Sequence, residues 1–206
     1  MTGPDDALER AHRAAGRALV AGTDEAGRGC LAGPVVAAAV VLPPGAALPG
    51  LDDSKRLSAD ARAALVPRIR RAALAVGVGQ CGPDEIDRWN VLGASLEAMR
   101  RAVAALATPD GAPLVPDVLL VDGNRALPDA PWPQETVVKG DARSVSIAAA
   151  SVLAKVTRDA VMEALDADVP AYGWAQHKGY PTVAHYAALA AHGPSPHHRR
   201  SFRLSR

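Results

Sequence analysis

The chain has 206 residues, of which 49% are hydrophobic and 22% are charged, and its formal net charge is +1. This is an ordinary globular composition with enough apolar residues for a core, and the length fits one domain, or one domain with a small appendage. Because only 3% of the residues are aromatic, we expect a core built from Ala, Val and Leu. The net charge alone does not indicate a nucleic-acid-binding protein.

Cysteine usage and hydropathy exclude several classes of protein. The two cysteines, Cys30 and Cys81, have no CxxC spacing, which argues against a zinc site and against a disulfide framework. No run approaches the ~18 apolar residues that span a membrane. The acidic segment 1–6 lacks the basic-then-apolar order of a signal peptide. We therefore predict a cytoplasmic protein.

Apolar periodicity and turn signals predict a mixture of strands and helices. In chain order, the pattern predicts a short helix from Ala7, strands over 18–23 and 34–42, a helix over 59–73, a strand over 75–80, a helix over 91–106, strands over 117–122 and 136–138, and helices over 144–165 and 183–191. Pro67 predicts a kink or two shorter helices within 59–73, because an interior proline costs roughly 3 kcal/mol. This order is typical of an α/β fold with a mixed sheet flanked by helices and a helical C-terminal part.

Acidic residues stand at the ends of predicted strands, or just beyond them, at three places: Asp24 with Glu25, Asp122, and Asp141. Because strand ends converge in an α/β sheet, these carboxylates are expected to meet. Their mutual repulsion becomes favourable with divalent cations between them, and oxygen-only ligands suit Mg²⁺ or Mn²⁺. Two such ions about 3.5–4 Å apart can clamp the attacking and leaving oxygens of a phosphodiester.

The segment that follows Glu25 adds two further features. Gly27 and Gly29 remove side chains from the backbone, so another molecule can come close, and Arg28 carries a charge suited to phosphate. One short segment therefore offers metal ligands, an open backbone and an anion contact.

Simpler interpretations of these residues stay open at this point. Asp24 and Asp122 can be ordinary strand-end acids that cap turns, and Asp122-Gly123 is itself a turn signal. A dinucleotide-binding fingerprint is disfavoured, because Gly33 is one position late for GxGxxG and the segment from Pro34 predicts a strand rather than a helix. No GxxxxGK[ST] motif occurs in the chain.

Taken together, these motifs resemble those of type 2 ribonuclease H, the ribonuclease HII family. The resemblance extends from about Leu19 to Phe202, and it is specific because all the segments occur in the same order. The segments that carry it are Asp24-Glu25-Ala26-Gly27-Arg28-Gly29, Leu31-Ala32-Gly33-Pro34-Val35-Val36, Asp53-Ser54-Lys55, Val121-Asp122-Gly123-Asn124, Val138-Lys139-Gly140-Asp141, Ala149-Ala150-Ser151-Val152-Leu153-Ala154-Lys155-Val156-Thr157-Arg158-Asp159, Tyr172-Gly173-Trp174-Ala175-Gln176-His177-Lys178-Gly179-Tyr180-Pro181-Thr182 and His197-His198-Arg199-Arg200-Ser201-Phe202.

The resemblance implies a ribonuclease H-like mixed sheet and a single domain over 1–206, with about 165–206 as a helical and basic substrate-binding part. It implies an endonuclease that cuts RNA in RNA–DNA hybrids and nicks on the 5′ side of single ribonucleotides in duplex DNA. Such an enzyme leaves 3′-hydroxyl and 5′-phosphate ends and uses two divalent ions, Mg²⁺ or Mn²⁺. The family's catalytic, metal-binding carboxylates fall on Asp24, Glu25, Asp122 and Asp141.

The resemblance also implies contacts with the nucleic acid. The backbone at Gly27, Arg28 and Gly29 would approach the ribose 2′-hydroxyl, which distinguishes RNA from DNA. Tyr180 would stack on the deoxyribose that follows the ribonucleotide. Further contacts are expected from Ser54, Lys55, Lys155 and Arg158, and from the basic tail 197–206. The alternatives are a packed core or surface aromatic for Tyr180 and solvated side chains for the charged residues.

Few positions depart from the family pattern. Cys30 stands where a proline is frequent, and we expect a packing change only. His197 and His198 are expected to be structural or electrostatic residues rather than metal ligands. The chain ends soon after Phe202, without the extension or the clamp-binding peptide that some relatives carry.

Two other functions stay open. A non-catalytic hybrid-binding module on the same fold is disfavoured by the four intact acids, and a metal-dependent phosphatase for small substrates is disfavoured by the basic tail and Tyr180. We expect a monomer whose partner is nucleic acid.

Overall fold

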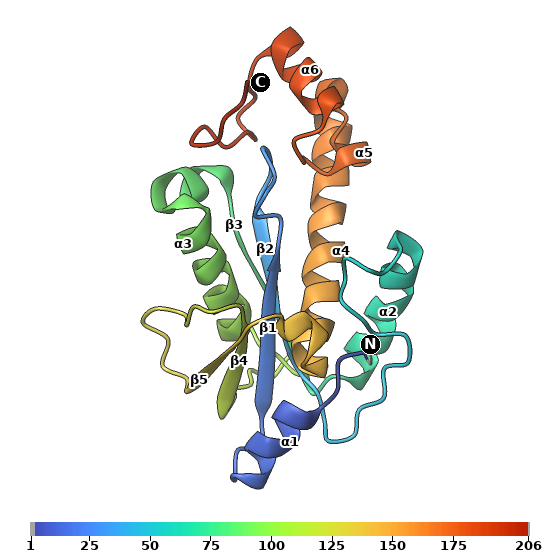
Figure 1. The fold of residues 1–206 in the computed structure, drawn as a ribbon, viewed down its shortest axis with the longest axis vertical. Coiled ribbons are helices and arrows are strands. Elements are labelled where there is room, and N and C mark those ends of the chain that lie inside the picture. Colours follow the sequence, from blue (N-terminus) through green and yellow to red (C-terminus); the bar gives the residue numbers. More distant parts are fainter. Residues whose placement is uncertain (1–2, 206) are drawn as a thin grey trace.

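A five-stranded mixed sheet forms the centre of the structure, a computed structural model that describes residues 3–205 (Figure 1). The sheet order is β3-β2-β1-β4-β5, with β1 (Val20–Ala26), β2 (Val35–Val41), β3 (Ala75–Cys81), β4 (Val118–Asp122) and β5 (Gln134–Val137). The first three strands are antiparallel neighbours, and β4 and β5 run parallel to β1. The prediction of an α/β fold with a mixed sheet is confirmed. Met1 and Thr2, from the predicted acidic start, and Arg206, from the predicted basic tail, lie outside the described residues.

Helices cover both faces of the sheet (Figure 1). The helix α3 (Pro83–Ala104) packs on one face, and α2 (Ala59–Ala72) and α4 (Val145–Asp168) pack on the other. Glycines in the strands allow the close approach, because a Cβ on Gly79 would lie 2.3 Å from the Ala98 carbonyl oxygen of α3. A Cβ on Gly22 would lie 2.4 Å from the Ile147 nitrogen of α4. Any side chain at these two positions would push a helix off the sheet.

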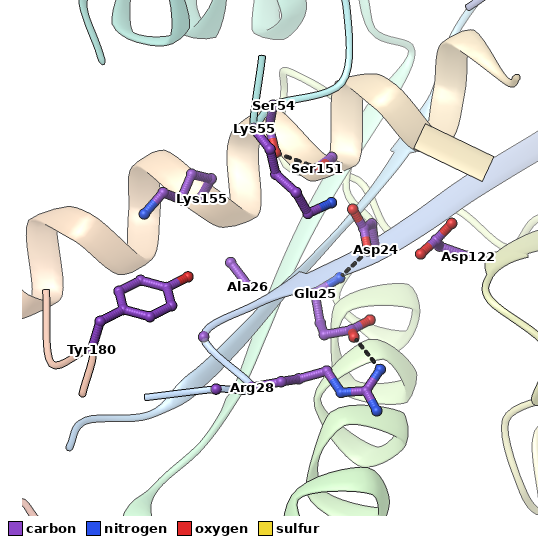
Figure 2. Close-up of a pocket in the computed structure, with 12 residues that line it drawn as sticks. Asp24, Glu25, Ala26, Arg28, Ser54, Lys55, Asp122, Ser151, Lys155 and Tyr180 are labelled. Carbon is purple, nitrogen blue, oxygen red and sulfur yellow. Dashed lines mark hydrogen bonds and ion pairs between the residues drawn. The ribbon is translucent and has the colours of Figure 1, made fainter. Parts of the chain in front are cut away.

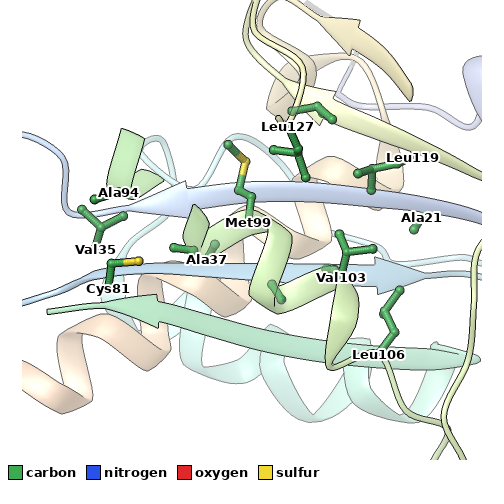
Figure 3. Packing of buried hydrophobic residues seen from close by; sticks show 14 of the residues in the cluster. Ala21, Val35, Ala37, Cys81, Ala94, Met99, Val103, Leu106, Leu119 and Leu127 are labelled. Carbon is green, nitrogen blue, oxygen red and sulfur yellow. The ribbon is translucent and has the colours of Figure 1, made fainter. Parts of the chain in front are cut away.

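Small aliphatic side chains fill the core, as the low aromatic content predicts (Figure 3). Every residue of β2 is buried, so this strand is apolar on both faces rather than alternating. The two large aromatics Tyr172 and Trp174 stack with ring centroids 4.9 Å apart, but they lie in the C-terminal part and not in the sheet core.

The strand β1 is longer than the sequence predicts, and this changes where the first two acids lie. It continues to Ala26 because its antiparallel ladder with β2 pairs Asp24 with Ala38 and Glu25 with Ala37. The two carboxylates therefore belong to the strand and, since successive side chains alternate, they leave it on opposite faces.

Two helices also differ from the prediction. Of the two alternatives predicted at Pro67, a kink or two shorter helices, the second is wrong, because α2 runs through Pro67 as one helix. Pro67 and Ala63, whose carbonyl loses its usual donor there, are both exposed to water. The helix α3 begins at Pro83 instead of residue 91. Its backbone breaks at Asn90 (φ 60°), whose side chain accepts from the Leu92 nitrogen, so the predicted helix is its second half.

The C-terminal part folds back onto the loop between β1 and β2. After α4 come the short helix α5 (Trp174–His177) and α6 (Val183–His192), which confirms the predicted helical C-terminal part. A backbone bridge joins Ala32 to His198, and the Arg199 nitrogen donates to the Leu31 carbonyl at 2.9 Å. The tail therefore supports the loop that follows Glu25.

Within residues 3–205, no helix combines the length and hydropathy that a membrane span requires.

The short helix α1 (Ala7–Ala14) contributes a buried carboxylate to the start of α4. The Glu9 Oε1 atom accepts from the Ser144 hydroxyl at 2.6 Å and from the Ser146 nitrogen at 2.9 Å. The start of a helix attracts negative charge, because its first N–H groups have no partner in the helix. Glu9 therefore fixes the N-terminal end of α4, which carries side chains of the site described below.

Replacing Glu9 tests this cap. We expect Glu9→Ala to lower the free energy of unfolding by roughly 2–3 kcal/mol, because two donors lose a charged acceptor. Glu9→Gln keeps an oxygen that can accept from the two donors, so it should lower the free energy of unfolding clearly less. Its other oxygen position loses no contact, since the Oε2 atom of Glu9 is buried without a partner. Urea denaturation measures both changes. Equal losses in the two variants would contradict the cap.

Candidate active site

A cavity of about 350 Å³ opens where β1 and β4 end, between α4 and the loop after β1 (Figure 2). Nearly all of the predicted site residues line it: Asp24, Glu25, Gly27, Arg28, Gly29, Ser54, Lys55, Asp122, Lys155 and Tyr180. Residues far apart in the sequence therefore meet at one place, as the convergence of strand ends predicts.

The sheet itself brings the acids together. The strand β4 is parallel to β1 with Thr23 opposite Val121, so Asp24 and Asp122 follow side by side. Asp24 is only 4% exposed, and one of its carboxylate oxygens accepts from the Glu25 nitrogen at 2.7 Å. Figure 2 shows Asp24 and Glu25 on opposite sides of the strand, with Glu25 bonded to Arg28 at 3.1 Å.

Asp141 is paired with Lys55, which lines the cavity. It follows β5 in a 3₁₀ helix, and its Oδ2 atom accepts from the Lys55 ammonium at 2.9 Å. The neighbouring Gly140 nitrogen donates to Asp122 at 2.7 Å. Asp141 is not one of the residues that line the cavity, so the structure brings three of the four predicted acids to the cavity wall.

The carboxylates are held in an environment that disfavours their charge. Burial raises the pKa of Asp24 well above its ordinary value, and the charges of Glu25 and Asp122 raise it further. Burial also raises the pKa of Glu25, although Arg28 opposes this effect. For Asp122, burial again raises the pKa, against the hydrogen bond from Gly140. A cation between these groups would relieve the desolvation and the repulsion together.

Among residues 3–205, no three His, Cys, Asp or Glu side chains are already gathered as a metal site. The donors that face the cavity nevertheless fit a hard divalent cation. They are carboxylate oxygens, the ligands that Mg²⁺ and Mn²⁺ prefer, and no His or Cys stands among them.

Two buried arginines hold the loop that follows Glu25. The Arg199 guanidinium is fully buried and donates to the carbonyls of Gly27 at 2.8 Å, Arg28 at 2.9 Å and Gly33 at 2.9 Å. Gly27 has φ +99°, and a Cβ there would lie 2.0 Å from Arg158 Nε. The glycine is therefore required by backbone conformation and by the arginine packed against it.

The structure corrects the prediction that Arg158 contacts the nucleic acid. Its guanidinium is fully buried and donates to the carbonyls of Pro34 at 3.0 Å, Ala32 at 3.1 Å and Lys178 at 2.9 Å. All three nitrogens are thus occupied by the protein. The same holds for Arg199 in the predicted basic tail, whereas Arg200 and Arg203 are exposed.

Residues of α4 complete the wall of the cavity. Ser151, which the sequence analysis did not single out, lies 2.9 Å from Ser54 through their hydroxyls, and its hydrogen bond to Asp24 lowers the pKa of that acid. One turn along the helix, the Lys155 ammonium lies 5.6 Å from the centre of the Tyr180 ring. Tyr180 is 41% exposed, which is unusual for a large aromatic and leaves a ring face available.

Cys30 is fully buried next to this ring. Burial raises the pKa of its thiol.

A second hollow of about 250 Å³ continues the cleft on the other side of the acids. It shares Glu25, Arg28 and Asp122 with the first, and the exposed Arg125 stands at its edge. The acids therefore lie in the middle of an elongated cleft with cationic side chains on both sides.

A mixed sheet that holds several carboxylates in such a cleft, beside cationic groups, is the arrangement of a metal-dependent phosphodiester hydrolase. Comparisons with known proteins identify the family. The family model described as Ribonuclease HII matches residues 21–205. The chain is 55% identical to the ribonuclease HII of Salinibacter ruber over 201 residues, covering 96% of this chain and 98% of that one. It is 58% identical to that of Syntrophotalea carbinolica over 184 residues, covering 89% and 85%.

Solved structures agree with these relatives. Ribonuclease HII of Archaeoglobus fulgidus, solved with PCNA, is similar with a TM-score of 0.74 and 25% identity, over 91% of this chain and 96% of that one. Ribonuclease H2 of Pyrococcus horikoshii shares the fold with a TM-score of 0.70 and 24% identity, over 91% and 95%. Bst-RNase HIII, solved with Mn²⁺, shares it with a TM-score of 0.63 and 22% identity, over 91% and 68%.

The chain belongs to the ribonuclease HII family. It is a ribonuclease H endonuclease, a metal-dependent hydrolase that acts on RNA in RNA–DNA hybrids.

Removing the charge of Asp24 should stabilise the protein in the absence of metal. Because the pKa of Asp24 is raised in the folded state, its ionised form destabilises the fold at pH values above that raised pKa. This penalty disappears below the ordinary value of 3.8. Asp24→Asn keeps the oxygen that accepts from Glu25, so we expect a gain of roughly 1–3 kcal/mol at neutral pH in EDTA.

The gain should shrink as the pH falls toward 3.8, and urea denaturation at several pH values measures it. Asp84→Asn, at an exposed position of α3, is the matched control and should change little. A loss of stability in Asp24→Asn at neutral pH would contradict the account.

Arg199 and Arg200 provide a variant and a matched control that test the contacts holding the loop after Glu25. Arg199→Lys keeps the charge but cannot reach three carbonyls with one ammonium, so we expect a loss of roughly 2–3 kcal/mol in the free energy of unfolding. Arg200→Lys, at an exposed position, should leave it unchanged. Thermal or urea denaturation separates the two, and equal behaviour would show that the Arg199 contacts carry little energy.

Proposed function

We propose that this protein nicks duplex DNA at single embedded ribonucleotides, as well as cutting RNA in hybrids. Cleavage falls on the 5′ side of the ribonucleotide and leaves 3′-hydroxyl and 5′-phosphate ends, the reaction that begins removal of ribonucleotides from DNA. The observation that carries the proposal is one cleft with acids at its centre, the Gly27–Gly29 loop beside them and the half-exposed ring of Tyr180 at one end.

Asp24, Glu25 and Asp122 are the residues that would hold two divalent ions, with Asp141 as the fourth acid. When bound, such ions, Mg²⁺ or Mn²⁺, would lower the pKa of the attacking water and stabilise the leaving 3′-oxygen. The donor chemistry and the raised pKa values of Asp24, Glu25 and Asp122 support this assignment.

The loop after Glu25 is suited to contact the ribose. An added Cβ on Gly29 would meet nothing within 4 Å, so packing inside the protein does not require a glycine there. A glycine with free space in front of it allows a close approach from outside. Arg199 and Arg158 hold the carbonyls of the loop, which keeps its backbone in one position for a 2′-hydroxyl.

Positive side chains along the cleft would bind the backbone of the nucleic acid. Lys55 is exposed beside the acids, and Arg28 and Arg125 line the continuation of the cleft. Ser54 lies at the same wall and Lys155 lies over Tyr180. We assign Lys55, Arg28 and Arg125 to phosphate contacts and Tyr180 to the deoxyribose that follows the ribonucleotide.

We also propose that 1–206 forms one domain whose part from about 165 onward helps to bind the substrate. This part carries Tyr180, and its exposed Arg200 and Arg203 can meet the duplex. The proposal includes a monomeric protein in the cytoplasm, which is consistent with two cysteines that are buried and unpaired.

A nicking assay tests the proposed function. The substrates are a DNA duplex with one ribonucleotide, the same duplex without it, and an RNA–DNA hybrid, each with Mg²⁺ and then Mn²⁺. We expect wild type to cut only on the 5′ side of the ribonucleotide in the first, and Asp24→Asn to be slower by roughly 100-fold or more.

The exposed-acid variant Asp84→Asn should cut like wild type. Cleavage of the hybrid without cleavage at the single ribonucleotide would contradict the proposal, as would an unchanged rate in Asp24→Asn.

A further inference from the structure

A chain of hydrogen bonds through buried histidines ends at Tyr180. His177, His185 and His198 come together beside Trp174 in the C-terminal part. His185 and His198 are 0% and 1% exposed, and neither forms an ion pair among the described residues. No metal-ligand cluster includes them within residues 3–205. Their role must therefore be found in the hydrogen bonds that they make.

Ser195 determines which nitrogen of His198 carries the proton. Its backbone N–H lies 3.0 Å from His198 Nδ1, and its hydroxyl lies 2.9 Å from the same atom. The hydroxyl already accepts from the His197 nitrogen, which leaves its hydrogen free to point at His198. A backbone N–H can only donate, so Nδ1 is an acceptor and the proton of the neutral ring is on Nε2.

This proton then fixes the next histidine. His198 Nε2 lies 3.0 Å from His185 Nε2, which also accepts from the indole N–H of Trp174 at 3.2 Å. His185 Nε2 is therefore an acceptor, and its ring proton is on Nδ1. That Nδ1–H lies 3.0 Å from the Tyr180 carbonyl oxygen, which can only accept. In this arrangement no donor faces a donor, two donors share the single lone pair of each acceptor nitrogen, and both rings are neutral.

His177 holds the other side of the same segment. Its ring stacks on that of His185 with centroids 4.5 Å apart, and its Nδ1 accepts from the Gly179 nitrogen at 3.3 Å. The Tyr180 nitrogen donates to the His177 carbonyl at 2.9 Å. The backbone on both sides of Tyr180 is thus tied to this cluster.

The surroundings keep these rings uncharged. Burial lowers the pKa of His198 to about 4, and the nearby His185 contributes in the same direction. Burial likewise lowers the pKa of His185. A positive ring here would have a donor facing a donor, so the network has no place for an extra proton.

We propose that His185 is a positioning residue for Tyr180: the chain Ser195–His198–His185 holds the Tyr180 carbonyl and so fixes the ring that faces the cleft. The inference rests on the proposed role of Tyr180 at the ribonucleotide–deoxyribonucleotide junction. It predicts that selectivity for single ribonucleotides depends on one donor atom of a residue that does not line the cavity.

Two amide variants separate this role from simple packing. The amide of Asn reaches the place of the Nδ1 atom, so His185→Asn keeps a donor for the Tyr180 carbonyl. The longer Gln places its amide near Nε2, so His185→Gln keeps a partner for Trp174 and His198 but loses that donor. The readout is kcat/KM on a duplex with one ribonucleotide divided by kcat/KM on an RNA–DNA hybrid.

We expect His185→Asn to stay within about twofold of the wild-type ratio and His185→Gln to lower it on the order of tenfold, because small misplacements of binding groups are costly. With Tyr180→Ala as background, His185→Gln should have no further effect on the ratio. Equal ratios in the Asn and Gln variants, or a further loss in the Tyr180→Ala background, would overturn the proposal.

NMR gives a test that does not depend on activity. The imidazole nitrogen shifts of wild type should show neutral rings with the proton on Nδ1 in His185 and on Nε2 in His198. The ring resonances of Tyr180 should move in His185→Gln and stay in place in His185→Asn. Other tautomers, or unmoved Tyr180 resonances in His185→Gln, would overturn the positioning role of His185. Failure of wild type to nick would refute the proposed function instead, and the NMR result stands independently of it.

Discussion

Parallel pairing of β1 with β4 places carboxylates of like charge next to each other where burial opposes their ionisation, and much of the surrounding structure depends on this. The register puts Asp24 beside Asp122, and strand alternation sends Glu25 to the opposite side of β1. The pKa values of these three acids are raised because burial and neighbouring negative charges oppose their ionisation. The folded protein thus holds an unfavourable set of charges that divalent cations would make favourable.

Positive charge is buried on the other side of the same loop. Arg158 and Arg199 form no ion pair among the described residues, and their guanidinium groups are satisfied by backbone carbonyls. Burying two guanidinium groups costs solvation free energy. Their hydrogen bonds fix the backbone of the loop between β1 and β2. The tail and α4 each supply one arginine, so the C-terminal part is needed to shape the loop beside the acids.

Much of this architecture could be predicted from local patterns. Apolar runs identified the five strands, and the acids at their ends indicated where the site lies. The strand β1 was predicted to end at Thr23, but the pairing of Asp24 and Glu25 with β2 continues it to Ala26. The division of α2 at Pro67 was wrong because the proline lies on the exposed side, where water can satisfy the freed carbonyl.

The buried polar contacts could not be predicted from the sequence. An arginine is exposed in most proteins, so nothing local indicated that Arg158 and Arg199 bind carbonyls in the interior. Ser151 sits in an alanine-rich helix and gave no signal. The tautomers of His185 and His198 depend on partners from several elements, and only the folded arrangement reveals them. The most direct test of the central claim is a calorimetric titration of the protein, free of nucleic acid, with Mn²⁺. The account predicts binding by wild type and by Asp84→Asn that is lost or greatly weakened in Asp24→Asn, and equal binding by all three would contradict it.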